Sequence, residues 1–221
     1  MDYPSTHWTT LRAVDVDPLR RRAAWESLAR RYRGVIRGHL ARALGTQEAE
    51  DHVQEFLLRS VRDDWWQRAD PARGRFRGFL RLLLDRYVGH VREQRRLPLA
   101  EASATEVADP AAGPEASYDR DFATALAARA LARVGADYAR RGQAATFAVL
   151  QPLLADAPSG ALKDAAAPLG VTPNALAAAL RRLRLAHATA MREELALLLA
   201  DRADLDDEWR EIGAALGAAS D

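Results

Sequence analysis

A short segment early in the chain carries closely spaced side chains that could bind a basic partner. These are Glu48, Asp51, Gln54 and Glu55. At three- and four-residue spacing, several of them share one side of a helix, where they could meet Lys and Arg side chains of another protein. Two other interpretations stay open. The acids could simply stabilise a solvated helix start, or with His52 they could bind a metal ion, although no further ligand cluster accompanies them.

A second segment combines Arg with aromatic side chains, which suits nucleic acid. Residues 73–96 are rich in Arg and contain only two acids, Asp85 and Glu93. Guanidinium groups neutralise phosphates, and aromatic or imidazole rings can stack on unpaired bases. Alternatively, Phe79 and Leu83 form an apolar core stripe with Tyr87, and the arginines solvate the other face. The predicted DNA-binding side chains are Arg75, Arg77, Arg81, Tyr87, His90, Arg92, Arg95 and Arg96.

A third segment has the pattern of a helix-turn-helix. A short helix near 162–170, a Val171-Thr172-Pro173 turn and an Arg-rich helix follow one another. Pro168 should shorten or bend the short helix. Thr172 and Asn174 lie where base edges of the major groove can be reached. The predicted phosphate contacts are Arg181, Arg182 and Arg184, and the inward side chains are Leu176, Leu180, Leu183 and Leu185. A purely structural helical corner would show the same pattern.

The elements that must position these residues are all helical. Apolar residues recur at three- and four-residue steps, and Ala, Leu and Arg dominate the composition. We expect an all-α fold of two small domains joined by a flexible linker, followed by a C-terminal amphipathic helix. The expected helices cover 19–44 (one helix or a kinked pair), 47–62, 76–96, 119–141, 143–155, 174–199 and 204–217.

The net charge of successive segments supports the same division into two domains, a linker and a C-terminal segment. Residues 1–96 carry a net charge of +7, residues 97–117 carry −4, residues 118–200 carry +3 and residues 201–221 carry −5. Alternating blocks of this kind suggest basic modules with an acidic linker and tail. The predicted organisation is therefore an N-terminal extension (1–18), a helical domain (19–96), a linker (97–117), a helix-turn-helix domain (118–200) and an acidic extension (201–221).

Several classes of protein are disfavoured by the sequence. It contains no Cys, so a disulfide framework and a thiolate zinc site are excluded. We find no P-loop, GxGxxG, GxSxG or HExxH pattern, and therefore expect neither enzymatic activity nor a cofactor. A secretory signal and a long apolar run are absent from the sequence, so we expect a cytoplasmic protein without a membrane partner.

Four strings together resemble the extracytoplasmic-function type of RNA polymerase sigma factor. Residues 48–56 resemble the acidic "AED-x-x-Q-E-F" helix of that family's second region. Residues 70–80 resemble the "DP-x-RGRFR-x-FL" entry into the promoter-melting helix of one subset. Thr6-His7-Trp8-Thr9 is similar to that subset's amino-terminal "T-x-W-S/T". Residues 118–120 and the segment ending at 184 resemble the start and end of the fourth region.

The resemblance implies a bacterial transcription initiation factor that binds core RNA polymerase and promoter DNA. The acidic helix would contact the clamp helices of the largest polymerase subunit, and the basic helix would hold melted DNA. Trp65 and Trp66 stand where family members hold a flipped promoter base, although at least one could instead cap the bundle. The linker could lie near the polymerase active site or be an ordinary linker, and an anti-sigma factor or another regulator could be a further partner.

Other interpretations remain open for the whole chain and for its tail. The chain could be a helix-turn-helix regulator that acts without polymerase, or a sigma-like inhibitor or adaptor that binds polymerase but no promoter. In the tail, Leu205, Trp209, Ile212 and Leu216 form an apolar stripe beside four acids. This helix could complete the core of the second domain. It could instead mask a DNA- or polymerase-binding face and be displaced on assembly.

Overall fold

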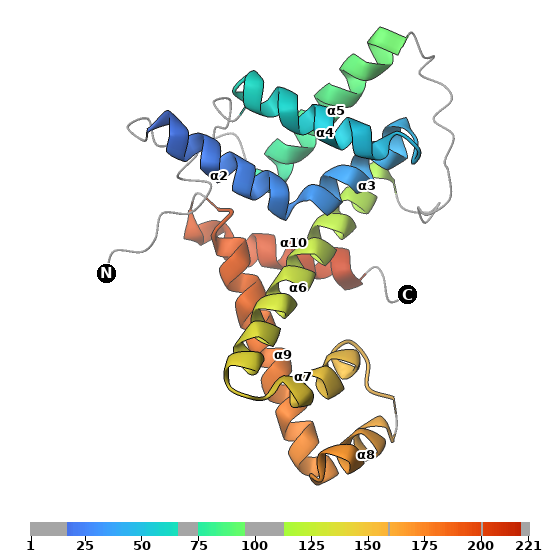
Figure 1. Ribbon diagram of the computed structural model, residues 1–221, viewed down its shortest axis with the longest axis vertical. Coiled ribbons are helices and arrows are strands. Elements are labelled where there is room, and N and C mark those ends of the chain that lie inside the picture. The colour runs from blue at the N-terminus through green and yellow to red at the C-terminus, as the bar shows by residue number, and fades with distance from the viewer. Residues whose placement is uncertain (1–16, 66–74, 96–112, 159, 200, 218–221) are drawn as a thin grey trace. The chain divides into compact units, whose positions relative to one another are not determined.

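The computed structural model describes residues 17–65, 75–95, 113–158, 160–199 and 201–217, and this part of the chain is helical without strands (Figure 1). The prediction of an all-α fold is confirmed. The helices are α2 (Pro18–Arg31), α3 (Arg33–Leu44), α4 (Ala49–Arg62), α5 (Phe76–Arg95), α6 (Pro114–Arg140), α7 (Ala144–Leu150), α8 (Ala161–Ala166), α9 (Pro173–Ala196) and α10 (Leu205–Gly217). Short 3-10 turns are η3 (Gln151–Leu153), η4 (Ala167–Leu169) and η5 (Arg202–Asp204). Within the described ranges, every helix is too short or too polar to serve as a transmembrane segment.

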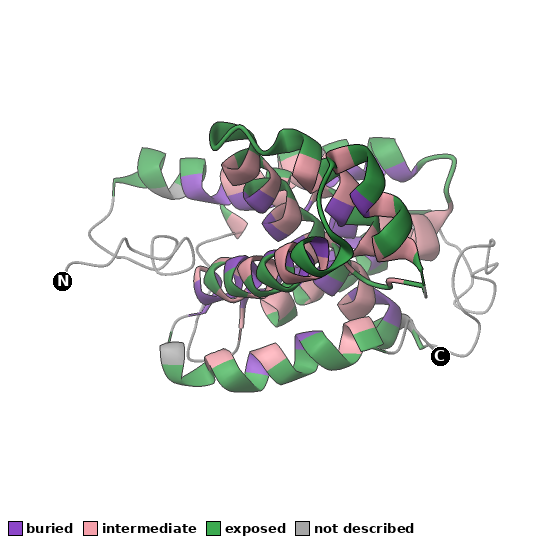
Figure 2. Cartoon of the chain, turned by 90° about the horizontal axis from the view of Figure 1, so that it is seen from below, coloured by how far each residue is buried: buried purple, intermediate pink, exposed green. Residues whose placement is uncertain are grey.

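The chain divides into two compact units. The first unit contains residues 1–125 and 195–221, and the second contains residues 126–194. In both units the helices bury residues along one side and expose the other (Figure 2). This pattern is the amphipathic periodicity on which the helix predictions depended.

The first unit is built on α2 to α5. Asp17 caps α2, since its carboxylate accepts a hydrogen bond from the backbone N–H of Leu19 at 3.0 Å. Tyr32 separates α2 from α3, which confirms the kinked pair predicted over residues 19–44. α3 packs against α4 and α5, and α2 packs against α4. The indole N–H of Trp25 donates to the Ser60 hydroxyl at 2.8 Å, so this buried polar group is satisfied.

The beginning of α6 also belongs to the first unit. The ring of Phe122 stacks on Tyr32 at 4.7 Å between centroids, and Tyr118 is fully buried and donates a hydrogen bond to the carbonyl of Arg77 at 3.0 Å. The structure thus differs from the expected boundary, which placed residues 118–125 in the second domain. Helix α6 begins at Pro114, inside the predicted linker, and residues 97–112 of that linker lie outside the described residues.

The C-terminal helix α10 is grouped with the first unit as well. Ile212 of its apolar stripe is buried, and the helix forms ion pairs with Arg75 and Arg77. These ion pairs lie within the first unit, whereas the sequence led to the expectation that this helix completes the core of the helix-turn-helix domain. The sequence pattern identifies the stripe and the acids but does not say which basic surface receives them.

The second unit contains the segments in which the helix-turn-helix was predicted. α8 ends at Ala166, and Pro168 lies in the 3-10 turn η4, as expected for a helix that Pro shortens. Gly170 then adopts a left-handed conformation with φ of 63°, which Gly allows without steric cost. The Thr172 hydroxyl accepts a hydrogen bond from the backbone N–H of Ala175 and caps α9, with Pro173 at the first helical position.

Candidate nucleic-acid interface

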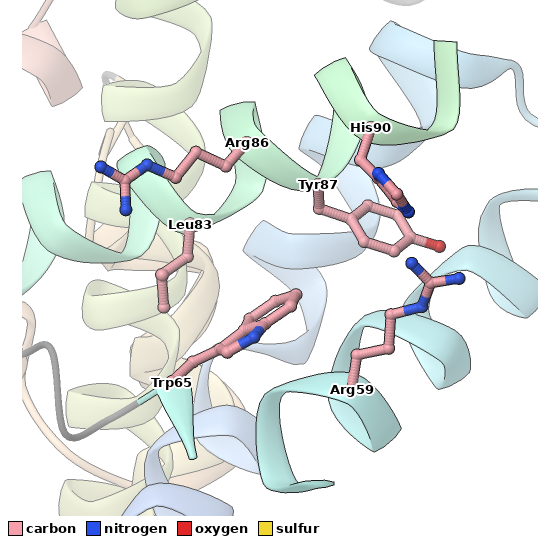
Figure 3. A pocket seen from close by; sticks show the side chains of 6 residues that line it. All are labelled: Arg59, Trp65, Leu83, Arg86, Tyr87 and His90. Atoms are coloured by element: carbon pink, nitrogen blue, oxygen red, sulfur yellow. The ribbon is translucent and has the colours of Figure 1, made fainter. Parts of the chain in front are cut away.

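A small pocket in the first unit lies between α4, α5 and the start of the loop after α4. Its volume is about 100 Å³, and Figure 3 shows its six lining side chains. Leu83 points toward the Trp65 indole, while the guanidinium groups of Arg59 and Arg86 lie at opposite ends. The lining residues are Arg59, Trp65, Leu83, Arg86, Tyr87 and His90. Aromatic surface bordered by Arg is the combination that single-stranded nucleic acid prefers.

The floor of this pocket is fixed by aromatic packing. Phe56 packs edge-on against Trp65 at 5.5 Å and against Tyr87 at 5.7 Å between ring centroids. Trp65 therefore covers the bundle, as the alternative interpretation of the Trp pair proposed, and still lines the pocket. Trp66 lies outside the described residues.

Tyr87 is a wall of the pocket rather than an exposed stacking platform. Only 3% of the residue is exposed, because it occupies the buried stripe of α5 with Leu83 and Leu84. Its hydroxyl lies 3.0 Å from Nδ1 of His52, which is itself buried. The geometry does not support the prediction that the Tyr87 ring stacks freely on DNA bases.

His52 is fixed by this network and is not part of a metal cluster. Burial lowers the pKa of its imidazole, and the nearby Arg95 guanidinium lowers the pKa further. The hydrogen bond from Arg95 also lowers the pKa of the Glu48 carboxyl. Among the described residues, no group of three or more His, Asp or Glu side chains is arranged to hold a metal ion.

Two arginines at the pocket were missed by the sequence analysis. Arg86 is exposed on α5 one turn before His90, which is also exposed. This four-residue spacing on a predicted helix would have been enough to find Arg86. Arg59 comes from α4 and forms an ion pair with Glu55. No pattern in the sequence links Arg59 to α5, because the two helices meet only in the fold.

The arginines at the start of α5 are engaged by acids. Arg75 pairs with Glu208 and Glu211, and Arg77 pairs with the same two acids and with Asp119. Burial alone would lower the pKa of the Arg77 guanidinium, but the carboxylates around it outweigh burial and raise the pKa. At Arg75, too, burial lowers the pKa of the guanidinium, but Glu208 and Glu211 outweigh burial and raise it.

Arg81, one turn further along α5, follows the same pattern with a different helix. It pairs with Glu115 of α6, and this contact raises the pKa of the Arg81 guanidinium. All three predicted DNA-binding residues at the start of α5 therefore contact acids in the structure.

The arginines at the other end of α5 also have local roles. Arg92 donates to the Ala43 carbonyl at 2.9 Å and so satisfies a backbone group in the last turn of α3. Arg95 pairs with Glu48, the residue directly before α4. Arg96 lies outside the described residues. Of the residues predicted on α5 to contact DNA, His90 and Arg95 are exposed, and His90 lines the pocket.

The acidic segment forms one exposed face of α4. Asp51 and Gln54 are exposed, whereas Glu48 and Glu55 form ion pairs with Arg95 and Arg59. Leu58 lies one turn beyond Gln54 and is 68% exposed. Leu58 was not among the contact residues predicted from the sequence, although it falls outside the apolar stripe of this helix. A face with polar side chains and one large apolar side chain suits contact with another protein.

In the second unit, the predicted DNA-binding residues divide into two groups. Thr172, Asn174, Arg181 and Arg182 are exposed on the turn and on α9. Arg184 instead donates hydrogen bonds to the carbonyls of Leu153 and Leu154, at 3.1 and 3.0 Å. Leu185 was expected to point inward but is 70% exposed, because it follows the buried Leu183 by only two residues and falls on another side of the helix.

Comparison with known proteins adds no further assignment. No protein-family model, no curated protein and no solved structure matches the chain.

Proposed function

We propose that this protein is a bacterial transcription initiation factor of the extracytoplasmic-function sigma type, acting in the cytoplasm on core RNA polymerase and promoter DNA. The observation that carries the proposal is the pocket lined by Trp65 and Tyr87, beside which Arg86 and His90 are exposed. It lies between the two helices whose sequences resemble the second region of the sigma family. A flipped base could contact the indole while the Arg side chains approach the adjoining phosphates.

The acidic helix supports the polymerase part of the proposal. Asp51, Gln54 and Leu58 lie on one exposed side of α4, away from the core that Val53 and Phe56 build. A basic clamp surface would meet the carboxylate, and Leu58 would supply the apolar contact at the centre of the interface. Glu48 and Glu55 would lie at the rim, because they already pair within the chain.

The second unit supports a role in reading duplex DNA. Thr172 and Asn174 stand at the amino-terminal end of α9, and Arg181 and Arg182 follow about two turns later. A recognition helix that enters the major groove uses its first residues for bases, while nearby basic residues meet phosphates. In this proposal Arg184 does not contact DNA directly, since its guanidinium binds backbone carbonyls.

The pocket can be tested with a short single-stranded oligonucleotide containing 2-aminopurine, a base whose fluorescence is quenched by stacking. Binding should quench the probe in the wild-type protein. The Trp65→Ala substitution should reduce both quenching and affinity, the latter by about tenfold, because base–aromatic stacking contributes roughly 1–3 kcal/mol. Arg86→Ala should weaken binding mainly at low salt. Arg22→Ala, at an exposed Arg of α2 that pairs with Glu26, is the matched control. Wild-type binding without quenching would contradict the assignment of the pocket.

A pull-down with core RNA polymerase separates the proposal from its two alternatives. A regulator that acts without polymerase should bind duplex DNA but not the core enzyme. An inhibitor or adaptor should bind the core enzyme but give no transcription. The initiation factor proposed here should bind the core enzyme and direct transcription from specific promoters.

A further inference from the structure

A carboxylate of α10 is buried among arginines at the start of α5. Glu208 is only 1% exposed, although its neighbours Asp206 and Asp207 are exposed. It accepts hydrogen bonds from Arg75 and, at 3.0 Å, from Arg77. A buried carboxylate requires such partners, because its desolvation is otherwise very costly. Glu208 is therefore held specifically by the arginine pair.

Glu211, one turn later on α10, extends this contact to the surface. Its carboxylate is half exposed and binds both Arg75, at 2.9 Å, and Arg77. The two guanidinium groups thus hold two carboxylates side by side. Arg forks bind carboxylate and phosphate oxygens with the same bidentate geometry. The α10 carboxylates occupy donors that a nucleic-acid backbone would also use.

The charge balance of this cluster depends on α10. Arg75, Arg77 and Arg81 face two acids of α6, Glu115 and Asp119, in addition to the two acids of α10. With α10 in place the acids outnumber the arginines. Without the α10 carboxylates, the arginines would be in excess. The same surface therefore repels a polyanion in one state and attracts it in the other.

The cluster is accessible from solvent without unfolding the bundle. A cavity of about 280 Å³ lies beside it, with Arg75, Arg77, Arg81, Glu115, Asp119 and Glu211 among its lining residues. A phosphate group entering this cavity would meet Arg75 and Glu211 together. The phosphate would replace the exposed carboxylate of Glu211 before the buried carboxylate of Glu208. An exposed ion pair contributes little free energy to stability, whereas a buried ion pair costs much more free energy to break.

We propose that α10 and the nucleic-acid backbone compete for Arg75 and Arg77. In the free protein α10 covers these arginines, and promoter DNA displaces it. This inference rests on the proposed function for the identity of the DNA. The acidic C-terminal helix thus restrains DNA binding until promoter DNA competes for the same guanidinium groups.

The test uses the full chain and a fluorescent single-stranded oligonucleotide, with binding followed by anisotropy at several salt concentrations. Glu211→Gln should tighten binding by about two- to fivefold, the size expected when an exposed ion pair is removed. It should also steepen the salt dependence by about one unit, because the freed guanidinium groups gain a phosphate contact. Asp207→Asn is the matched control, since Asp207 lies on the same helix and pairs with Arg210.

A second substitution ties the gain to the arginine pair. Arg75→Ala in the Glu211→Gln background should remove the tighter binding, whereas Arg22→Ala in that background should leave it intact. Glu208→Gln should give a larger gain if the variant folds. Glu211→Gln keeps the proposal testable if Glu208→Gln does not fold, because Glu211 is half exposed.

Hydrogen exchange of the α10 amides provides the second readout. Adding the oligonucleotide to the wild-type protein should increase exchange in α10 and leave exchange in α3 unchanged. Equal affinities and salt slopes for wild type, Glu211→Gln and Asp207→Asn, with unchanged α10 exchange, would overturn the inference. Failure of transcription with core polymerase, with the competition still observed, would contradict the proposed function alone.

Discussion

At the residue scale, several side chains whose types suit DNA binding turn out to hold the fold together. Tyr87 packs in the core, Arg92 caps α3, and Arg184 binds the carbonyls after α7. Residue type could not have separated these roles, because an aromatic ring serves a core as well as a base, and a guanidinium serves a carbonyl as well as a phosphate. The apolar spacing of α5 did predict that Tyr87 packs in the core, which was the alternative interpretation of the sequence.

Two histidines that are largely removed from solvent, His52 and His39, predict a loss of stability in mild acid. Burial is the main cause that lowers the pKa of His52 and of His39, although Asp85 opposes it at His39. The unfolded chain therefore takes up protons at a higher pH than the folded chain. Stability should be full above the ordinary imidazole pKa of 6.5 and should fall as the pH drops below it. Thermal melts followed by circular dichroism between about pH 7.5 and 5 check this expectation.

The His52→Gln variant should lose less stability over the same range than the wild type. A melting temperature that stays constant or rises as the pH falls would contradict the burial argument. A further loss below about pH 4.5 belongs to Glu48. Arg95 lowers the pKa of this carboxyl in the folded protein, so the unfolded chain takes up the proton first as the pH falls.

The polar contact inside the first unit gives a second prediction at this scale. Ser60 accepts the Trp25 indole N–H and donates to the Leu57 carbonyl, both at 2.8 Å. Ser60→Ala leaves the buried N–H without its acceptor and should cost about 1–3 kcal/mol of unfolding free energy. Urea denaturation measures the loss. Ser60→Thr, which keeps the hydroxyl, should recover part of it, and equal stability of Ser60→Ala and wild type would refute the role of this contact.

At the element scale, the helices were predictable to within a few residues, whereas their grouping was not. The sequence predicted a helix over 204–217, and α10 covers Leu205–Gly217. Local periodicity identifies an amphipathic helix but contains no information about the surface that receives its stripe. The start of α6 was assigned to the linker and the second domain for the same reason, since Tyr118 and Phe122 contact residues far away in the sequence.

The grouping of α6 with the first unit can be measured directly. Phe122 is buried against Tyr32, Phe76 and Tyr118. Phe122→Ala should destabilise the first unit by about 3–5 kcal/mol, because it removes a buried aromatic side chain and leaves a cavity. Hydrogen exchange should then increase in α2 and α3. Thr124→Ala, at an exposed position on the same helix, should change stability by about 0.5 kcal/mol or less. Equal effects of the two substitutions would argue against this packing.

At the scale of the whole molecule, the proposal assigns separate surfaces to separate partners. The α4 face would meet polymerase, the α5 pocket a single strand, and the start of α9 duplex DNA. Asp51→Lys should therefore weaken binding of core polymerase by more than about tenfold, as charge reversal at an interface does, and leave oligonucleotide binding unchanged. Arg62→Ala, at an exposed residue of α4 that pairs with Asp63, is its control. Titration of labelled protein with core polymerase measures the affinities, and an unchanged affinity for Asp51→Lys would remove α4 from the interface.

Initiation of transcription is the activity that the proposed function requires. The direct measurement is transcription in vitro by core RNA polymerase on genomic DNA fragments from the source organism, with and without the protein. We expect transcripts with defined start sites only when the protein is present. Asp51→Lys and Trp65→Ala should reduce these transcripts, whereas Arg22→Ala should not. Transcripts that are unchanged or suppressed on addition of the protein would contradict its role as an initiation factor and favour an inhibitor or a regulator independent of polymerase.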